Sequence, residues 1–196
     1  MNIFVLDENP KVAAQMHCDK HVCKMSIEYA QLLSTAHHIH NTDIAQTGHI
    51  YKPTHAKHPA TLWVSTHPLH YAWVFELMRE TWNEYTYRYQ RVHASSRLLS
   101  ALQIVPNMGT IVPNMGTIEM PTAPPQCMPN ACKVSGNSWQ ATATAYRQYY
   151  MIEKRAFATW KTREIPTWFM PQNCVDSLPM SQYNISHETK FSSLGR

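Results

Sequence analysis

The sequence has little glycine, few charged residues and no long apolar run. Gly occurs five times in 196 residues, which leaves no glycine-rich loop of the kind that binds nucleotide phosphates. Charged residues make up 15% of the chain and hydrophobic residues 44%, a balance that excludes a highly charged disordered chain and a coiled coil. No stretch approaches the roughly 18 apolar residues of a membrane helix, and no Gly-x-Ser-x-Gly motif indicates a serine nucleophile.

Cysteine usage and the first residues favour a cytoplasmic protein. The five cysteines form an odd set, and Met1–Pro10 lacks the basic and apolar regions of a secretion signal. We therefore expect reduced thiols, a cytoplasmic location and no membrane contact. Lys and Arg number 17 against 13 Asp and Glu, a net charge of +4 that is compatible with a polyanionic partner.

The hydrophobic pattern predicts an all-α fold, a compact single-domain helical bundle over residues 1–170 with a short extended segment at its N-terminus. That segment is Asn2–Leu6, and Asp7–Pro10 is typical of a capped, proline-led helix start. The predicted helices cover Pro10–Ala36, Ala60–Val64, Pro68–Arg91, Ala94–Leu102 and Ser138–Trp160.

Three stretches are predicted to lie outside the helices. Residues 39–58 are turn-rich, and residues 103–134 form a Pro-rich loop that contains an immediate tandem heptapeptide copy, Ile104–Thr110 followed by Ile111–Thr117. Two copies are too few for a solenoid and are tolerated in a surface loop. Residues 171–196 are polar and are predicted to be a C-terminal tail.

A polar stripe on the first long helix is the main candidate site. At about 100° per residue, six polar side chains fall within one arc of roughly 100°; these are His17, Lys20, His21, Lys24, Glu28 and Gln31. Apolar residues flank the stripe on both sides, so we expect it to line a crevice. Two interpretations remain open, an acid/base site around Glu28 or a solvated face with a Lys24–Glu28 ion pair.

The stripe contains histidines, which are common metal ligands, and lysines, whose amines can act as nucleophiles. His17 and His21 are four residues apart, a spacing that suits two ligands of one ion, and His58 can approach from the loop. Lys20 and Lys24 interleave with that pair and oppose the binding of a dication, so we expect no metal and no cofactor. The remaining nucleophiles are the two lysines and the N-terminal amine, any of which can form a Schiff base with a sugar aldehyde.

The same residues carry a resemblance to a known protein family. Asp19-Lys20-His21 followed by Glu28 resembles the N-terminal signature of the pyrimidine dimer DNA glycosylases of the endonuclease V type. Further features agree in order along the chain; these are His58-Pro59-Ala60-x-x-Trp63, the acidic-then-basic turn Glu84–Arg88, and the Arg163–Phe169 stretch. The resemblance covers most of residues 1–170 and leaves residues 40–57 and 103–134 unmatched.

The resemblance implies roles for individual residues. Met1 supplies the reactive N-terminal amine, Glu28 takes the place of the catalytic carboxylate, and His21 that of a helix histidine near the substrate. The candidate substrate-binding residues are Lys20, Lys24, His58 and Arg163, which would hold phosphate, together with His17, and Trp63 or Trp168, which could stack on an unpaired base. The family places arginines beside its catalytic Glu, whereas this chain has Ile27 and Tyr29 there, which weakens the expectation of duplex DNA binding.

Three hypotheses of function follow. The first is a DNA N-glycosylase and abasic-site lyase that acts on a damaged or modified pyrimidine through a Schiff base on the N-terminal amine. The second is a hydrolase or transferase that uses the same site on free, modified nucleotides. The third is a non-enzymatic interaction protein with a Trp-rich docking helix. Lys154, Arg155 and Lys161 are expected to form a solvated basic face, and the sequence leaves the base and the oligomeric state open.

Overall fold

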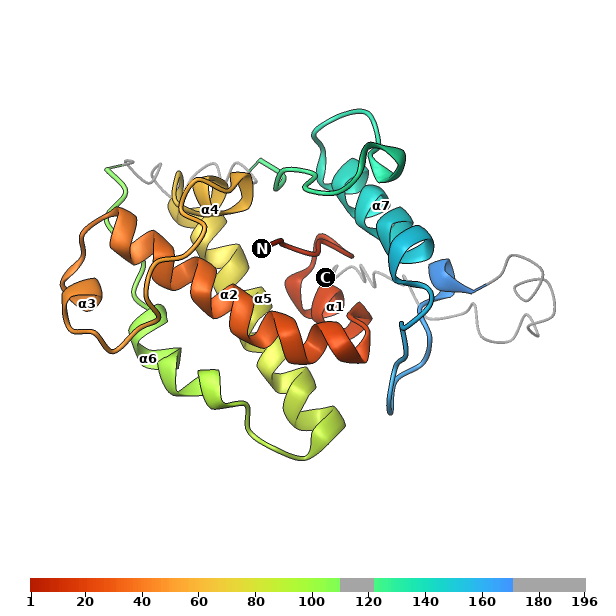
Figure 1. Cartoon of the computed structure of the whole chain (residues 1–196), viewed down its shortest axis with the longest axis horizontal. Helices are drawn as coiled ribbons and strands as arrows, with labels where there is room; N and C mark the ends of the chain where they lie inside the picture. The colour runs from red at the N-terminus through yellow and green to blue at the C-terminus, as the bar shows by residue number, and fades with distance from the viewer. Residues whose placement is uncertain (110–121, 171–196) are drawn as a thin grey trace, which may run out of the picture.

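The computed structural model describes residues 1–109 and 122–170, and helices dominate both ranges (Figure 1). The elements in chain order are α1 (Pro10–Met16), α2 (Asp19–Ile39), α3 (Asp43–Gln46), α4 (Pro59–Val64), α5 (Pro68–Tyr89), η1 (Ala94–Leu98), α6 (Leu99–Leu102), η2 (Asn130–Cys132), α7 (Trp139–Tyr149), η3 (Tyr150–Lys154) and η4 (Thr167–Phe169). The two described ranges contain no strand, so the predicted all-α class is confirmed. No helix in them is long and apolar enough to cross a bilayer.

The long helix predicted over Pro10–Ala36 is two helices, so the prediction of one continuous helix was wrong. His17 and Cys18 adopt extended backbone conformations between α1 and α2, with ψ angles of 136° and 161°. The buried guanidinium of Arg88 donates to the main-chain oxygens of Gln15 and His17 at 2.9 and 2.8 Å. Because these carbonyls have no helical partner at the break, a side chain from α5 stabilises it.

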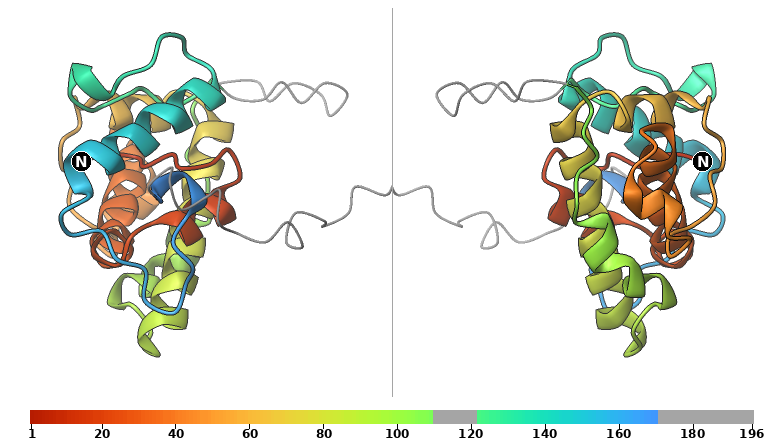
Figure 2. Two further views of the ribbon diagram at one scale, coloured as in Figure 1. Left: turned by 90° about the vertical axis from the view of Figure 1, so that its right-hand side faces the viewer. Right: turned by 90° about the vertical axis from the view of Figure 1, so that its left-hand side faces the viewer.

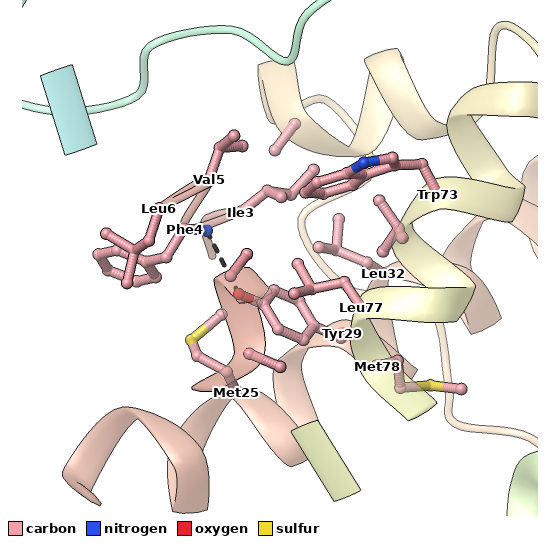
Figure 3. Close-up of a cluster of buried hydrophobic side chains, with 14 of the residues drawn as sticks. Ile3, Phe4, Val5, Leu6, Met25, Tyr29, Leu32, Trp73, Leu77 and Met78 are labelled. Carbon is pink, nitrogen blue, oxygen red and sulfur yellow. Dashed lines mark hydrogen bonds between the residues drawn. The ribbon is translucent and has the colours of Figure 1, made fainter. Parts of the chain in front are cut away.

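The core lies where α2 and α5 cross, with α1 packed against α5 (Figure 1). Apolar side chains of both long helices meet there (Figure 3); they include Met25, Tyr29 and Leu32 of α2 and Trp73, Leu77 and Met78 of α5. Most of them have no exposed surface. Burial of each such side chain contributes about 1.5–3 kcal/mol, so this crossing fixes the orientation of α2 and of the polar stripe on it.

The N-terminal segment runs through the middle of the molecule, between α2 and α7 (Figures 1 and 2). Ile3–Leu6 is buried. The ring of Phe4 lies 4.3 Å from that of His21 and 5.6 Å from that of Tyr146 on α7. Its main-chain N–H donates to the hydroxyl of Tyr29 at 3.3 Å (Figure 3). The start of the chain is therefore a packed element whose position is fixed.

Three helices begin at a histidine N-cap. His58, His67 and His93 each accept a hydrogen bond at Nδ1 from the main-chain N–H two residues ahead, at 3.2, 3.1 and 3.1 Å. Proline follows the first two at the first helical position, which favours the helix start. The helices predicted at Ala60–Val64 and Pro68–Arg91 are accordingly confirmed as α4 and α5.

The last helix is shorter than predicted. The prediction of one helix over Ser138–Trp160 was wrong, because α7 passes into the π-helical turn η3 and the helix ends at Lys154. Residues 155–170, which we call the strap, then turn back across α1, α2 and α5. The Asp19 carboxylate holds the strap by accepting the main-chain N–H of Lys161 at 2.9 and 3.0 Å. This contact joins residues far apart in sequence, which helix periodicity cannot detect.

The predicted loops are partly structured. Residues 39–58 contain the short helix α3, and residues 122–134 contain η2. The tandem copies, apart from residues 104–109, lie outside the described residues, as does the predicted tail at 171–196.

Candidate active site

Glu28 has an incompletely bonded carboxylate on α2. Its side chain is 16% exposed, and Oε1 pairs with the Nζ of Lys24 at 2.8 Å. Its Oε2 is buried and has no hydrogen-bond partner among the described residues. A buried carboxylate oxygen without a partner costs free energy, so its presence is typical of an atom that binds a ligand or transfers a proton.

The first two residues are held in place by side-chain contacts. The Thr61 hydroxyl of α4 donates to the sulfur of Met1 at 3.8 Å. The Asn2 amide donates to the main-chain oxygen of Cys127 at 2.7 Å and accepts a hydrogen bond from the hydroxyl of Tyr146. The Met1 amine is therefore attached to a backbone that α4, α7 and the segment after residue 122 restrain.

His58 connects this amine with Glu28 electrostatically. Burial lowers the pKa of His58, the positive charge of the Met1 amine lowers it further, and the Glu28 carboxylate raises it. The Met1 amine and the Glu28 carboxylate therefore each lie within electrostatic range of His58, and we call these three residues the amine cluster. Glu28 makes its ion pair with Lys24 and, within the described part of the chain, none with the amine.

The hydrogen bonding of His58 defines its tautomer. Its Nδ1 accepts the N–H of Ala60, so the neutral ring carries its proton on Nε2. Protonation of Nδ1 would remove the acceptor that caps α4. His58 is thus suited to donate a hydrogen bond from Nε2 and is poorly suited to act as a base.

The two histidines of the predicted stripe lie in the interior. His17 is fully buried; its Nδ1–H donates to the main-chain oxygen of Ala13 at 2.6 Å and its Nε2 accepts from the Tyr29 hydroxyl at 2.7 Å. His21 is 5% exposed and bonds the Tyr150 hydroxyl through Nδ1 at 2.5 Å. Burial lowers the pKa of His17 to about 4 and that of His21 to about 3. Both rings are neutral packing groups at pH 7, and a substrate has little access to them.

Arg163 is engaged in an internal ion network. Its Nε lies 3.1 Å from Oε2 of Glu84, its Nη2 bonds Oε1, and its guanidinium covers the ring of Tyr87. The hydrogen bonds to Glu84 raise the pKa of Arg163. Arg88 bonds Glu84 and Asp19 from the opposite side, both at 3.1 Å. We call these four charged residues the closed network, because they satisfy one another.

Neither predicted stacking tryptophan is free. Trp63 is 9% exposed, stacks on His70 with ring centroids 4.1 Å apart and donates its indole N–H to the main-chain oxygen of Thr122 at 3.1 Å. Trp168 is half-buried and donates to the sulfur of Met16 at 3.4 Å. Both indoles make packing contacts in this structure.

Lys20 and Lys24 reach solvent on α2, as the stripe predicts. The side chain of Lys24 is 61% exposed, and Lys20 is also exposed. Of the predicted site residues, Lys24 therefore pairs with Glu28, and Met1 and Glu28 each lie within electrostatic range of His58. His17, His21, Arg163, Trp63 and Trp168 form internal contacts.

Metal ligation has no geometric support in residues 1–109 and 122–170, since no group of three or more His, Cys, Asp or Glu side chains is arranged to hold an ion. A cleft of about 500 Å³ lies between α1 and the strap. Its lining includes Val12, Met16 and Arg163 but not Glu28.

Some of the residues that fix the site were not identified from the sequence. Asn2 and Thr61 restrain Met1, and Cys127 bonds Asn2 from the Pro-rich region. The position of Asn2 directly after the reactive residue is the one signal that pointed to it. Thr61 and Cys127 gave none, because their contacts span long sequence separations.

Comparisons of the chain with protein-family models, with curated proteins and with solved structures found no match. The resemblance to the pyrimidine dimer DNA glycosylases therefore rests on the sequence motifs alone.

Proposed function

We propose that the protein is a DNA N-glycosylase and abasic-site lyase that acts on a damaged or modified pyrimidine through the Met1 amine. The observation that carries the proposal is the unpartnered buried oxygen of Glu28 in a cluster with that amine and His58. An amine and a carboxylate with an open oxygen provide a nucleophile and a proton carrier, the two groups that Schiff-base chemistry requires.

The chemistry assigns one task to each group. The unprotonated Met1 amine attacks C1′ of the deoxyribose, and the C1′–N bond to the base breaks, with the base taking the electron pair and then a proton from water. The Glu28 carboxylate takes a proton from the new C1′-bound ammonium and gives it to O4′ as the C1′–O4′ bond opens, which leaves an iminium ion between Met1 and C1′ and returns Glu28 to the carboxylate. The Glu28 carboxylate then removes a proton from C2′, and the 3′ phosphate leaves by β-elimination.

His58 and Lys24 support these steps. The Nε2–H of His58 donates to an oxygen of the substrate, while its Nδ1 keeps α4 capped. Lys24 is exposed and leaves one oxygen of Glu28 free. It can therefore contact a phosphate without withdrawing the carboxylate from the reaction.

A second candidate, chemistry on free nucleotides at the same site, has one observation in its favour. Three arginines are used internally: Arg88 and Arg163 bind Glu84, and Arg147 bonds the main-chain oxygen of Leu6 at 2.8 Å. Few guanidinium groups remain to hold the two phosphate backbones of a duplex.

Borohydride trapping on an abasic oligonucleotide tests the proposed function. We expect reduction to give a covalent complex of the intact chain with the oligonucleotide. A variant with two extra residues before Met1 moves the amine away from Glu28 and should give no complex, while Lys24→Gln should still give one. Equal trapping by the extended variant would assign the nucleophile to a lysine and contradict the proposal.

A further inference from the structure

Three lysines outside the amine cluster each lie over an aromatic ring. The pairs are Lys154 on Tyr149, Lys20 on Phe157 and Lys161 on Tyr89, with Nζ to ring-centroid distances of 4.3, 4.8 and 5.6 Å. None of the three ammonium groups has a carboxylate partner within the part of the chain that the structure describes. We call these six residues the lysine–ring track.

Ring contacts connect the first two pairs. His21 packs against Phe157 on one side, with centroids 5.9 Å apart, and against Phe4 on the other at 4.3 Å. Phe4 in turn lies parallel to Tyr149, at 6.0 Å and an interplanar angle of 2°. The rings under Lys20 and Lys154 therefore belong to one aromatic cluster, which the buried His21 and Phe4 support from below.

Asp19 connects the third pair to the others. Its main-chain oxygen accepts a hydrogen bond from the Tyr89 hydroxyl at 3.3 Å, and its carboxylate binds the main-chain N–H of Lys161. Asp19 directly precedes Lys20 on α2. Contacts thus connect the three lysine–ring pairs, whose residues come from the last residues of α7 and α5, from η3, from the first turn of α2 and from the strap.

The lysines of the track are held weakly, in contrast to Arg163. An exposed cation over a ring gains little free energy, whereas Arg163 is fixed by hydrogen bonds to the buried Glu84. A phosphate can therefore attract a lysine of the track away from its ring. The ring face that becomes free is then available to a nucleobase.

We propose that the lysine–ring track binds single-stranded nucleic acid, with phosphates on Lys20, Lys154 and Lys161 and bases on the adjacent rings. Single-strand binding sites combine cations with stacking rings in this way, while the paired bases of a duplex cannot reach the rings. Lys24 lies one helical turn beyond Lys20 and pairs with Glu28, so the bound strand would continue toward the amine cluster. Only the continuation of the strand toward the amine cluster rests on the proposed function.

Fluorescence anisotropy with the full chain and a labelled oligothymidine of about 12 nucleotides tests the inference. We expect tighter binding to the single strand than to a duplex of equal length, by about tenfold or more. Affinity should fall with salt, and K20Q/K154Q/K161Q should weaken binding at least tenfold and reduce the logarithmic salt slope by about 2, because each lost phosphate contact removes about 0.7.

Two further variants separate the track from general charge. K11Q/K52Q/K133Q removes the same charge from three exposed lysines elsewhere and should change affinity by less than about threefold. Phe157→Leu keeps an apolar side chain and removes one ring; it should weaken binding about tenfold and leave the salt slope unchanged. Thermal unfolding of each variant verifies that the fold is retained.

The outcomes distinguish this inference from the proposed function. Equal affinity for single strand and duplex, or equal losses in the two triple variants, would overturn the track. Thymidine 5′-monophosphate that binds as tightly as the oligothymidine would identify a free nucleotide as the ligand and also overturn it. Oligonucleotide binding without a borohydride adduct would support the track and contradict the lyase, and an adduct without track-dependent binding would do the reverse.

Discussion

Two glutamates on the crossed helices α2 and α5 each pair with a basic residue of their own helix but have different surroundings. Glu28 pairs with Lys24 and Glu84 pairs with Arg88, both four residues away on the same helix. The Glu84 side chain is 5% exposed and both its oxygens bind guanidinium groups, while the Glu28 side chain is 16% exposed and leaves Oε2 without a partner.

The difference separates a structural carboxylate from a candidate reactive one. Around Glu84, Arg88 and Arg163 join α5 to the break after α1 and to the strap, so no atom is left for a ligand. Around Glu28, the partner Lys24 is exposed, and the carboxylate acts electrostatically on His58, which also experiences the charge of the Met1 amine. The four predictions below test this contrast, beginning with the largest expected effect.

Glu28→Gln should abolish most of the activity and leave the fold intact. The amide preserves the shape of the side chain but cannot carry the proton, so we expect strand cleavage at an abasic site to fall about 10²- to 10⁴-fold. The free energy of unfolding should change by less than about 1 kcal/mol, since the lost ion pair is exposed on the lysine side. Cleavage within about threefold of the wild-type rate would show that Glu28 is not the proton carrier.

Glu84→Gln should lower the stability of the fold more than the activity, the opposite of Glu28→Gln. Removal of the charge leaves Arg88, whose side chain has no exposed surface, with Asp19 as its remaining carboxylate partner among the described residues, so the free energy of unfolding should fall by about 3–5 kcal/mol in urea titrations. Glu76→Gln provides the control, because its pair with Arg79 is exposed and should contribute less than about 1 kcal/mol. Equal stability of the two variants would refute the closed network.

Lowering the pH should destabilise the folded protein, because the buried His17 and His21 have lowered pKa values. The folded pKa of His17 is about 4 and that of His21 about 3, both below the ordinary 6.5. Between pH 6.5 and these values the unfolded chain binds protons that the folded chain does not, so stability falls as pH falls, by up to about 1.4 kcal/mol per pH unit for each ring.

Urea titrations from pH 7 to about pH 4.5 measure this slope. His21→Gln should reduce the slope by the contribution of one ring. An unchanged slope in His21→Gln would mean that folding does not lower the pKa of His21.

The smallest expected effect separates the two His-Pro helix starts. Asn is a good N-cap, so His58→Asn and His67→Asn should each keep their helix and change stability by less than about 1 kcal/mol. His58→Asn should slow strand cleavage about tenfold because the Nε2–H near the amine is lost, and His67→Asn should have no effect. Equal rates in both variants would remove His58 from the site.

Local sequence signals predicted much of the fold. The His-Pro starts of α4 and α5 and the i, i+4 pair of Lys24 and Glu28 depend on residues within one turn, which periodicity and capping rules describe well. The all-α class follows from the same signals.

Long-range contacts were beyond these rules. The break at His17 is stabilised by Arg88, 71 residues away, and His21 is buried because Tyr150, 129 residues away, packs on it. Arg163 is unavailable to a phosphate because Glu84, 79 residues away, binds it. The charge, size and spacing of these side chains do not reveal such partners, so His17, His21 and Arg163 were predicted to contact a substrate although they make internal contacts.

The central claim is that the Met1 amine and Glu28 form one reactive site. Peptide mapping of the borohydride-trapped complex tests it most directly, because trypsin releases Met1–Lys11 as one peptide. We expect the reduced sugar to be attached to the N-terminal nitrogen of that peptide. Glu28→Gln, but not Glu76→Gln, should lower the yield of this adduct. An adduct on any lysine, or no adduct with the intact N-terminus, would contradict it.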